Sequence, residues 1–323
     1  MMKAIQIQET GGPEVLKLVE LPVPEAGPGQ LLIRVAATGV NFIDIYFREG
    51  RYKAPLPLVP GQETAGTVER LGPGVEGFAV GDRVATTAAL GAYAEYALTP
   101  AVTTVKVPDG VDLKTAAAVL LQGMTAHYLA CATWMLEPGE TALVHAAAGG
   151  VGLLLTQMAS AIGARVIATV STEEKAALAR AAGAAEVILY TEADFEAETK
   201  RLTNGRGVDV VYDSVGKTTF EKSLNCLRPR GLLALFGGSS GAVPPLDLIR
   251  LSHMGSLFVT RPTLKDYIAT RAELEERANA VFNGVLHGTL KVRCKHSYPL
   301  AGAAQAQIDI AGRKTTGKLV LIP

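Results

Sequence analysis

The sequence predicts an α/β protein with two domains, one rich in short strands and one built around a doubly wound parallel sheet. Three observations support this fold class. The 323 residues exceed what one ordinary hydrophobic core accommodates. Short β-like runs separated by glycine and proline fill the chain up to about Leu120. From about Asp112 onward, apolar strand-sized runs alternate with alanine-rich helical segments, the pattern of a parallel sheet covered by helices.

The strand-rich part contains runs such as Leu31 to Val40, Gly66 to Leu71 and Gly81 to Ala85. Turn signals such as Gly11-Gly12-Pro13 and Gly72-Pro73-Gly74 separate these runs. Many short strands with frequent turns predict a barrel or a sandwich.

The second part contains five runs that are typical of buried parallel strands: Thr141 to His145, Arg165 to Val170, Glu186 to Leu189, Val208 to Asp213 and Gly231 to Phe236. Predicted helices from Gly150 to Ile162 and from Thr172 to Ala182 lie between the first three runs. Leu257 to Val259 is a candidate sixth strand. Strand and helix in alternation predict the doubly wound sheet.

The last part of the chain, from about Thr263, holds a predicted helix through Ala280 and then short strands. Such a tail is too small to bury a core alone, so we expect it to rejoin the strand-rich domain. The predicted domains are therefore residues 1–124 with 264–323, and residues 125–263.

The composition argues against several classes of protein. An apolar fraction of 48% with 19% charged residues is that of a globular chain. The 31 basic and 31 acidic residues balance, which counts against a nucleic-acid partner. Three scattered cysteines, no signal-peptide core and no uninterrupted apolar span predict a cytoplasmic protein that does not cross a membrane.

A glycine-rich turn follows the first predicted parallel strand. Ala147, Gly149 and Gly152 stand at the three positions of a GxGxxG motif, with alanine at the first. Gly149 allows the backbone to approach a pyrophosphate, and Gly152 allows the helix to pack closely on the strand. The alternative is a purely structural turn in an α/β sheet. The strand and helix on either side favour a dinucleotide, whose phosphates the helix N-terminus would attract.

The end of the second parallel strand indicates which dinucleotide binds. NAD enzymes usually carry a carboxylate there for the ribose 2′-hydroxyl, whereas this chain has Ser171 and Thr172, followed by Lys175. Tyr190, after the third strand, can reach the same place. A cation and hydroxyls suit a 2′-phosphate, so the pattern favours NADP over NAD. The alternative is that Lys175 is only a solvated helix charge.

These features resemble those of the zinc-independent quinone oxidoreductases of the medium-chain dehydrogenase/reductase superfamily, the group that includes zeta-crystallin. The resemblance covers nearly the whole chain. Besides the glycine turn, it is carried by Gly39 to Asp44, Val59 to Gly66, Val80 to Val84, Leu121 to Ala126 and Val211 to Gly216. It implies a chaperonin-10-like (GroES-like) barrel joined to a Rossmann domain. It also implies a homodimer that pairs through the strand near Leu257 to Val259.

The resemblance also implies a site without metal. Zinc-dependent relatives keep a cysteine at the position of Asn41 and a histidine at the position of Gln62, and their third ligand region corresponds to Leu121 to Thr125, which has no cysteine. Amides are poor replacements for thiolate and imidazole. Glu63 remains, but one carboxylate does not make a zinc site.

Carried over from the family, the implied cofactor contacts are Asn41, Tyr46, Thr125, Tyr128, Gly149, Gly150, Val151, Gly152, Ser171, Lys175, Tyr190, Ser214, Phe236, Gly237, Phe258 and Arg313. Tyr46 and Asn41 are the candidate catalytic residues. Tyr46 would orient the acceptor or donate a proton to its oxygen, although solvent can also supply that proton. Asn41 would bond the acceptor or the ribose.

The implied reaction is hydride transfer from NADPH to a quinone, which needs no Lewis acid. One alternative is a reductase of enone or alkenal double bonds on the same frame. A second, from another class, is a non-catalytic NADPH-binding protein of the crystallin or nucleic-acid-binding kind. His145 beside the glycine turn is expected to be packed rather than catalytic.

Overall fold

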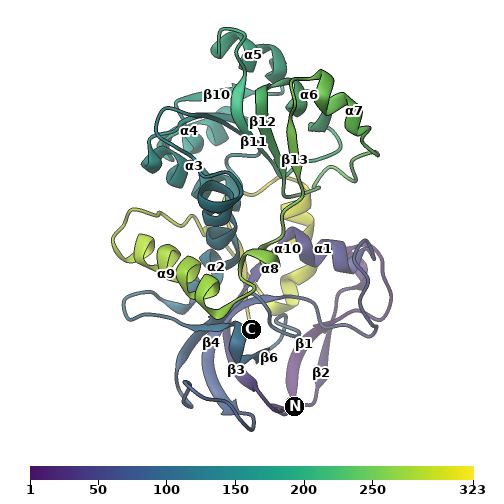
Figure 1. Cartoon of the computed structure of the whole chain (residues 1–323). Coiled ribbons are helices and arrows are strands. Elements are labelled where there is room, and N and C mark those ends of the chain that lie inside the picture. Colours follow the sequence, from purple (N-terminus) through teal and green to yellow (C-terminus); the bar gives the residue numbers. More distant parts are fainter. The chain divides into compact units, whose positions relative to one another are not determined.

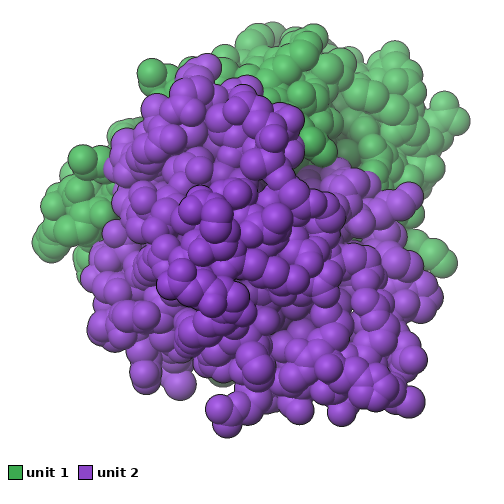
Figure 2. All heavy atoms as spheres, turned by 90° about the horizontal axis from the view of Figure 1, so that it is seen from above, with its two compact units in different colours: residues 1–122, 268–323 green, residues 123–267 purple.

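The computed structural model describes all 323 residues, and the chain divides into two units (Figure 2). Unit 1 comprises Met1–Gln122 and Ile268–Pro323, and unit 2 comprises Gly123–Tyr267. The C-terminal tail therefore belongs to the same unit as the N-terminal strands. The division falls within a few residues of the boundaries expected after residues 124 and 263.

Unit 2 is built on six parallel strands in the spatial order β10-β9-β8-β11-β12-β13 (Figure 1). Their bounds are β8 Thr141–Val144, β9 Arg165–Val170, β10 Glu186–Leu189, β11 Val208–Asp213, β12 Leu227–Leu235 and β13 Phe258–Thr260. Helices cover both faces of this sheet, and this burial explains why its strands are nearly continuous apolar runs. The predicted doubly wound sheet is confirmed.

Five helices connect the strands of unit 2: α3 Gly150–Ile162, α4 Glu173–Ala181, α5 Phe195–Leu202, α6 Phe220–Asn225 and α7 Leu248–His253. A sixth, α8 Leu264–Tyr267, follows β13. Helix α2, Leu113–Tyr128, begins in unit 1, ends in unit 2 and continues into a π-helical turn over Leu129–Thr133. Helix α3 packs beside α4, and α5 packs beside α6.

Strand β12 begins four residues earlier than predicted, because its first part bulges away from β11. Val208 pairs with Leu227, and Val210 pairs with Leu232. Between these two pairs, β11 has one residue, Asp209, whereas β12 has four, and these four form the bulge. The bulge carries Arg228 beside the Asp209 side chain.

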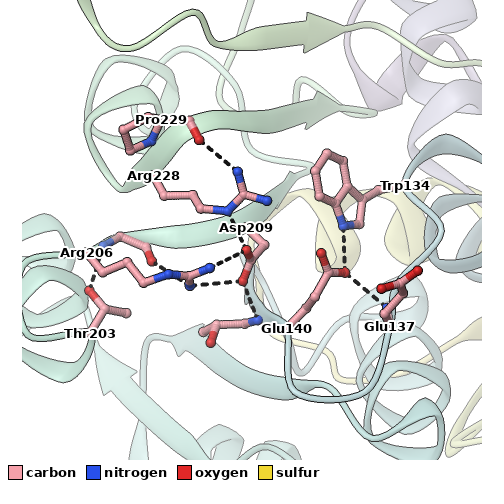
Figure 3. A network of polar contacts seen from close by, with 10 residues as sticks. Trp134, Glu137, Glu140, Thr203, Arg206, Asp209, Arg228 and Pro229 are labelled. Carbon is pink, nitrogen blue, oxygen red and sulfur yellow. Dashed lines mark hydrogen bonds and ion pairs between the residues drawn. The ribbon is translucent and has the colours of Figure 1, made fainter.

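Asp209 is the centre of a polar network at the beginning of the parallel strands (Figure 3). Its carboxylate accepts the Thr141 backbone N–H at 2.8 Å, the Arg206 guanidinium at 2.7 Å and Arg228 Nε at 2.5 Å. Burial raises the pKa of Asp209, but the hydrogen bonds from Arg206, Thr141 and Arg228 outweigh burial and lower it. The Arg228 guanidinium also lies over the Trp134 ring, 5.8 Å from its centroid. The network ties β8, β11 and β12 together.

Unit 1 contains a seven-stranded, mostly antiparallel sheet in the order β14-β15-β3-β4-β5-β7, with β6 paired to β3, and a separate β1-β2 pair. Its strands are β1 Met2–Gln6, β2 Lys17–Leu21, β3 Gln30–Val40, β4 Glu63–Leu71, β5 Arg83–Thr86, β6 Tyr96–Pro100, β7 Thr104–Lys106, β14 His296–Pro299 and β15 Leu319–Ile322. Its helices are α1 Phe42–Arg48, α9 Arg271–Leu286 and α10 Ala303–Ala311, with short 3₁₀ turns at Pro13–Val15, Ala101–Thr103 and Leu300–Gly302. The C-terminal strands β14 and β15 thus extend the N-terminal sheet.

The single helix predicted from Thr263 through Ala280 is two helices, α8 and α9. The break has a local cause, because Thr270 caps α9 by accepting the Glu273 backbone N–H while Glu273 accepts from the Thr270 backbone. Glu273 is therefore a capping residue of α9. No helix in the chain is both long enough and apolar enough to cross a membrane.

Candidate active site

In unit 2, the residues predicted to bind the pyrophosphate and the 2′-phosphate lie at the carboxyl ends of the strands. Strands β9 and β10 lie on one side of β8, and β11, β12 and β13 lie on its other side. The strand order therefore reverses direction at β8. Open α/β sheets bind ligands outside the carboxyl ends at such a reversal.

The glycine turn between β8 and α3 has the geometry that a pyrophosphate requires. Ala146 adopts a φ of +51°, and Gly149 donates its N–H to the Ala146 carbonyl at 2.9 Å. Gly149 caps α3 without a side-chain bond, so Gly150 and Val151 begin the helix with backbone N–H groups available to an anion. A Cβ on Gly152 would lie 2.4 Å from the Ala146 carbonyl oxygen, so close packing excludes any side chain there.

Ser171, Lys175 and Tyr190 lie together beyond β9 and β10. Lys175 Nζ donates to Ser171 Oγ at 3.3 Å, and the Tyr190 N–H donates to the Val170 carbonyl. Thr172 caps α4 by accepting the Lys175 backbone N–H. The cation and hydroxyls predicted for a 2′-phosphate are thus neighbours.

Ser214, Phe236 and Gly237 follow the adjacent strands β11 and β12. The Phe236 N–H donates to the Asp213 carbonyl at 2.9 Å, and a Cβ on Gly237 would lie 2.4 Å from the Ser214 carbonyl oxygen. The structure brings these three residues together at the same edge as the glycine turn.

His145 is packed in the core of unit 2, as predicted. Its ring nitrogens lie 2.9 Å from Thr169 Oγ1 and 3.0 Å from Ser223 Oγ. Burial lowers its pKa, although Asp213 opposes this shift.

Thr125 and Tyr128 are both buried on helix α2. The Tyr128 ring stacks on the Tyr267 ring, with centroids 4.2 Å apart and planes 9° apart. Burial, and Tyr267 to a smaller extent, raise the pKa of Tyr128. No local pattern could predict the part played by Tyr267, because it lies 139 positions after Tyr128.

In unit 1, Asn41 lies between β3 and α1 and is 5% exposed. Its side-chain Nδ2 donates to the Gly39 carbonyl at 3.2 Å and to Glu63 Oε2 at 2.9 Å. Its Oδ1 accepts from Lys318 Nζ at 2.6 Å. These bonds use both amide hydrogens and hold the Asn41 side chain in one orientation.

Asp44 lies in the first turn of α1, next to this cluster. Its Oδ2 accepts the Asn41 backbone N–H and the Tyr93 hydroxyl, each at 2.9 Å, while Oδ1 is buried without a partner. Burial raises the pKa of Asp44 to about 7, although the hydrogen bonds and Lys318 oppose it.

Tyr46 lies on the same helix, and 9% of it is exposed. Its ring meets the Tyr52 ring edge-on at 5.5 Å, and the Arg51 guanidinium lies 5.3 Å from its centroid. Asn41 and Tyr46 thus belong to one short segment, but Asn41 is enclosed in a polar cluster and Tyr46 in an aromatic one.

Two predicted residues lie apart from these groups. Phe258 begins β13, pairs with Leu232 and is 58% exposed at the outer edge of the sheet, away from the carboxyl ends of the strands. Arg313 has a φ of +59° in the turn after α10, where its backbone N–H donates to the Ile310 carbonyl.

Sequence reasoning missed the part played by Lys318, which lies 255 positions from Glu63. A signal for it exists, since Lys318 directly precedes the apolar run Leu319–Ile322. A lone charge beside such a run is either solvated or paired, and the sequence does not indicate which.

The residues at the predicted metal-free position do not fit zinc. The side chains gathered there are the Asn41 amide, the Glu63 carboxylate and the Lys318 ammonium, with the half-buried Gln62 next in sequence. Zinc sites use thiolates, imidazoles and carboxylates, and no group of three or more His, Cys, Asp or Glu side chains in the chain could hold a metal ion.

Comparison with known proteins matches both units to protein families. The family "Alcohol dehydrogenase GroES-like domain" matches residues 27–109, and the family "Zinc-binding dehydrogenase" matches residues 150–282. The first match confirms the chaperonin-10-like domain that the family resemblance implied.

Individual relatives match over the full chain. A quinone oxidoreductase of Pseudomonas aeruginosa is 47% identical over 100% of both chains. A 2-haloacrylate reductase of Burkholderia sp is 45% identical over 100% of this chain and 99% of its own. The crystal structure of Escherichia coli quinone oxidoreductase complexed with NADPH is 44% identical, covers 99% of this chain and 100% of its own, and superposes with a TM-score of 0.97.

Proposed function

The chain belongs to the quinone oxidoreductases of the medium-chain dehydrogenase/reductase superfamily, and from this premise we propose that it passes hydride from NADPH to a quinone without a metal ion. The observation that carries the proposal is the group formed by Ser171, Lys175 and Tyr190 at the strand ends beside the Gly149 turn. No carboxylate stands where an NAD enzyme would bind the 2′-hydroxyl.

The cofactor residues have distinct proposed parts. Gly149, Gly150, Val151 and Gly152 bind the pyrophosphate, and Ser171, Lys175 and Tyr190 bind the 2′-phosphate. Ser214, Phe236 and Gly237 contact the nicotinamide half, and Thr125, Tyr128, Phe258 and Arg313 remain proposed contacts on the family resemblance.

NADPH supplies the hydride, and the protein orients the acceptor. Tyr46 is the proposed group that orients the acceptor or donates a proton to its oxygen, since a neutral phenol is a suitable donor. Asn41 is proposed to contact the acceptor or the ribose through the remaining lone pair of Oδ1, because its amide hydrogens are already bonded.

We further propose a cytoplasmic homodimer. Strand β13 lies at the edge of its sheet and has an exposed Phe258. Leu248 and Ile249 on α7 are 73% and 64% exposed. An apolar edge strand invites pairing with a second copy. Three free cysteines suit a reducing compartment.

The direct test is oxidation of NADPH and of NADH with a panel of quinones, with metal content measured on the same sample. We expect quinone-dependent oxidation of NADPH in preference to NADH and no stoichiometric zinc. NADPH binding without oxidation by any acceptor would instead favour the non-catalytic alternative.

The cofactor assignment is tested by Lys175→Ala. We expect the KM for NADPH to rise about 10-fold or more, because a charged hydrogen bond to a phosphate contributes about 1.5–3 kcal/mol. The KM for NADH should hardly change. Lys200→Ala is the matched control, since Lys200 pairs with Glu196 on another helix of the same unit. Equal losses for both cofactors would remove the 2′-phosphate assignment.

A second candidate activity is reduction of a carbon–carbon double bond conjugated to a carbonyl group. The full-length match to a 2-haloacrylate reductase favours it specifically. Comparing kcat/KM for quinones with kcat/KM for enones and haloacrylates on one preparation separates the two.

A further inference from the structure

Three strands of unit 1 bring Lys318, Asn41 and Glu63 to one point. Leu319 pairs with Val40 in the antiparallel β15–β3 ladder, so Lys318 and Asn41 are the next residues in register. Gly39 pairs with Glu63 in the β3–β4 ladder. The sheet order β15-β3-β4 therefore places a cation, an amide and a carboxylate side by side.

The close approach depends on two glycines. A Cβ on Gly39 would lie 2.2 Å from Glu63 Oε2, so only glycine leaves room for the carboxylate. Gly317 has a φ of +68°, and a Cβ there would lie 2.2 Å from the Arg293 carbonyl oxygen. The Lys318 N–H then donates to that carbonyl at 2.8 Å, which fixes the backbone from which the ammonium extends.

The cluster is closed to water. The side chains of Lys318 and Glu63 are 1% and 0% exposed, and Nζ lies 2.5 Å from Glu63 Oε2. Glu63 Oε1 accepts the Leu121 N–H at 2.8 Å, and Oε2 also accepts from Asn41. A carboxylate buried in this way requires a positive charge beside it, and Lys318 supplies that charge.

We propose that Lys318 is a built-in cation, whose ammonium holds Glu63 and Asn41 in one arrangement and excludes a divalent metal ion from this cluster. The two oxygens that a metal would need, Glu63 Oε2 and Asn41 Oδ1, are the acceptors of the ammonium. A divalent ion added beside Lys318 would meet a like charge in a dry site. In this chain Lys318, as well as Asn41, then keeps zinc out of the cluster. This inference does not depend on the substrate of the enzyme.

The test uses Co²⁺ as a spectroscopic probe of metal binding by the full chain. The background carries Cys131→Ser and Cys294→Ser, because Cys131 is exposed and Cys294 lies within electrostatic reach of Lys318 and Glu63. In this background, N41C/K318H places a thiolate and an imidazole beside Glu63. We expect one Co²⁺ per chain, with thiolate-to-cobalt absorption and visible d–d bands, bound at least about 100-fold more tightly than by N41C alone.

The matched control is N41C/K318R, which gains the thiolate but keeps the cation, and we expect it to bind no Co²⁺. Tight Co²⁺ binding by N41C with Lys318 intact would overturn the proposal. So would a folded N41C/K318H that takes up no Co²⁺, with folding checked by circular dichroism and by a cooperative urea unfolding curve.

A second measurement needs no metal site and applies if N41C/K318H does not fold. In the otherwise unaltered chain labelled with ¹⁵N-lysine, one side-chain NH₃⁺ signal should be protected from exchange with water and should vanish in Lys318→Arg. A neutral amine, or no protected lysine signal, would contradict a resident cation.

Discussion

The two units each contain a buried carboxylate paired with basic side chains, and the two pairs differ in their access to water. Asp209 in unit 2 is 2% exposed in its side chain, but its partners Arg206 and Arg228 are 55% and 22% exposed. Glu63 and Lys318 in unit 1 are both enclosed. Partners that reach solvent can rehydrate when the pair is broken, whereas an enclosed partner cannot. The Asp209 pair therefore mainly holds neighbouring strands together, whereas the Glu63–Lys318 pair keeps a buried negative charge neutralised.

The surroundings of the two pairs also differ. Arg206, Arg228, Pro229 and Arg230 line an open surface cavity of about 680 Å³, and Asp209 already pairs with two of these arginines. This cavity lies where β11 and β12 begin, opposite the strand ends proposed for the cofactor. The Glu63 pair has no such opening, and its neighbour is Asn41, a proposed site residue.

Removal of the enclosed cation is expected to have the largest effect on the free energy of unfolding. Lys318→Met should lower the free energy of unfolding by about 3–5 kcal/mol, because it leaves the Glu63 charge buried and unpaired. Glu63→Gln combined with Lys318→Met should recover most of that loss. Urea unfolding curves measure both. A loss below about 1 kcal/mol in the single variant would show that water reaches Glu63.

The next largest effect is on the pH dependence of stability and concerns Asp44. Its pKa is raised to about 7, whereas the pKa of Asp209 is lowered. An unfolded chain releases the Asp44 proton near the ordinary value of 3.8, whereas the folded chain keeps it up to about pH 7. This carboxyl therefore makes stability fall as pH rises, by about 3 kcal/mol between pH 5 and pH 8. Asp44→Asn should remove this part of the pH dependence. Unfolding curves for both chains at several pH values compare the slopes, and parallel slopes would refute the assignment.

A smaller loss is expected in unit 2. Asp209→Asn keeps an acceptor for the Thr141 N–H and removes the charge, so it should cost about 1–2 kcal/mol. Because the arginines are partly exposed, this cost should shrink as salt is added. Urea unfolding at low and high salt provides the measurement, and the KM for NADPH should stay unchanged. A cost as large as that of Lys318→Met would erase the contrast between the two pairs.

The smallest expected effect is that of Arg206→Ala. More than half of the Arg206 side chain is exposed, and exposed ion pairs contribute about 0–1 kcal/mol. Arg228 still pairs with Asp209 in this variant. A shift of the thermal midpoint by no more than a few degrees, measured by circular dichroism, is the expected result. A loss of several kcal/mol would mean that Arg206 is integral to the network.

The amino-acid sequence determined most of the parallel strands of unit 2 and the two helices that follow the first two of them. Strands β9, β10 and β11 and helix α3 have the predicted bounds, because a continuous apolar run or a glycine turn is a local signal that neighbouring residues carry. The positions of Gly149, Gly152, Ser171 and Lys175 followed from the same signals. Turn signals predicted the strand-rich domain, and the family resemblance supplied its chaperonin-10-like form and the choice of Asn41 and Tyr46.

Only the tertiary structure decided what surrounds Asn41. Lys318, Asn41 and Glu63 lie at or next to the ends of three strands that are separated in sequence and adjacent in the sheet, and no local pattern records which strands pair. The start of β12 is a similar case, because its bulge depends on pairing with β11. The burial of a charge is a property of the assembled sheet. A sequence can supply a lysine and a glutamate, but only the fold removes the water between them.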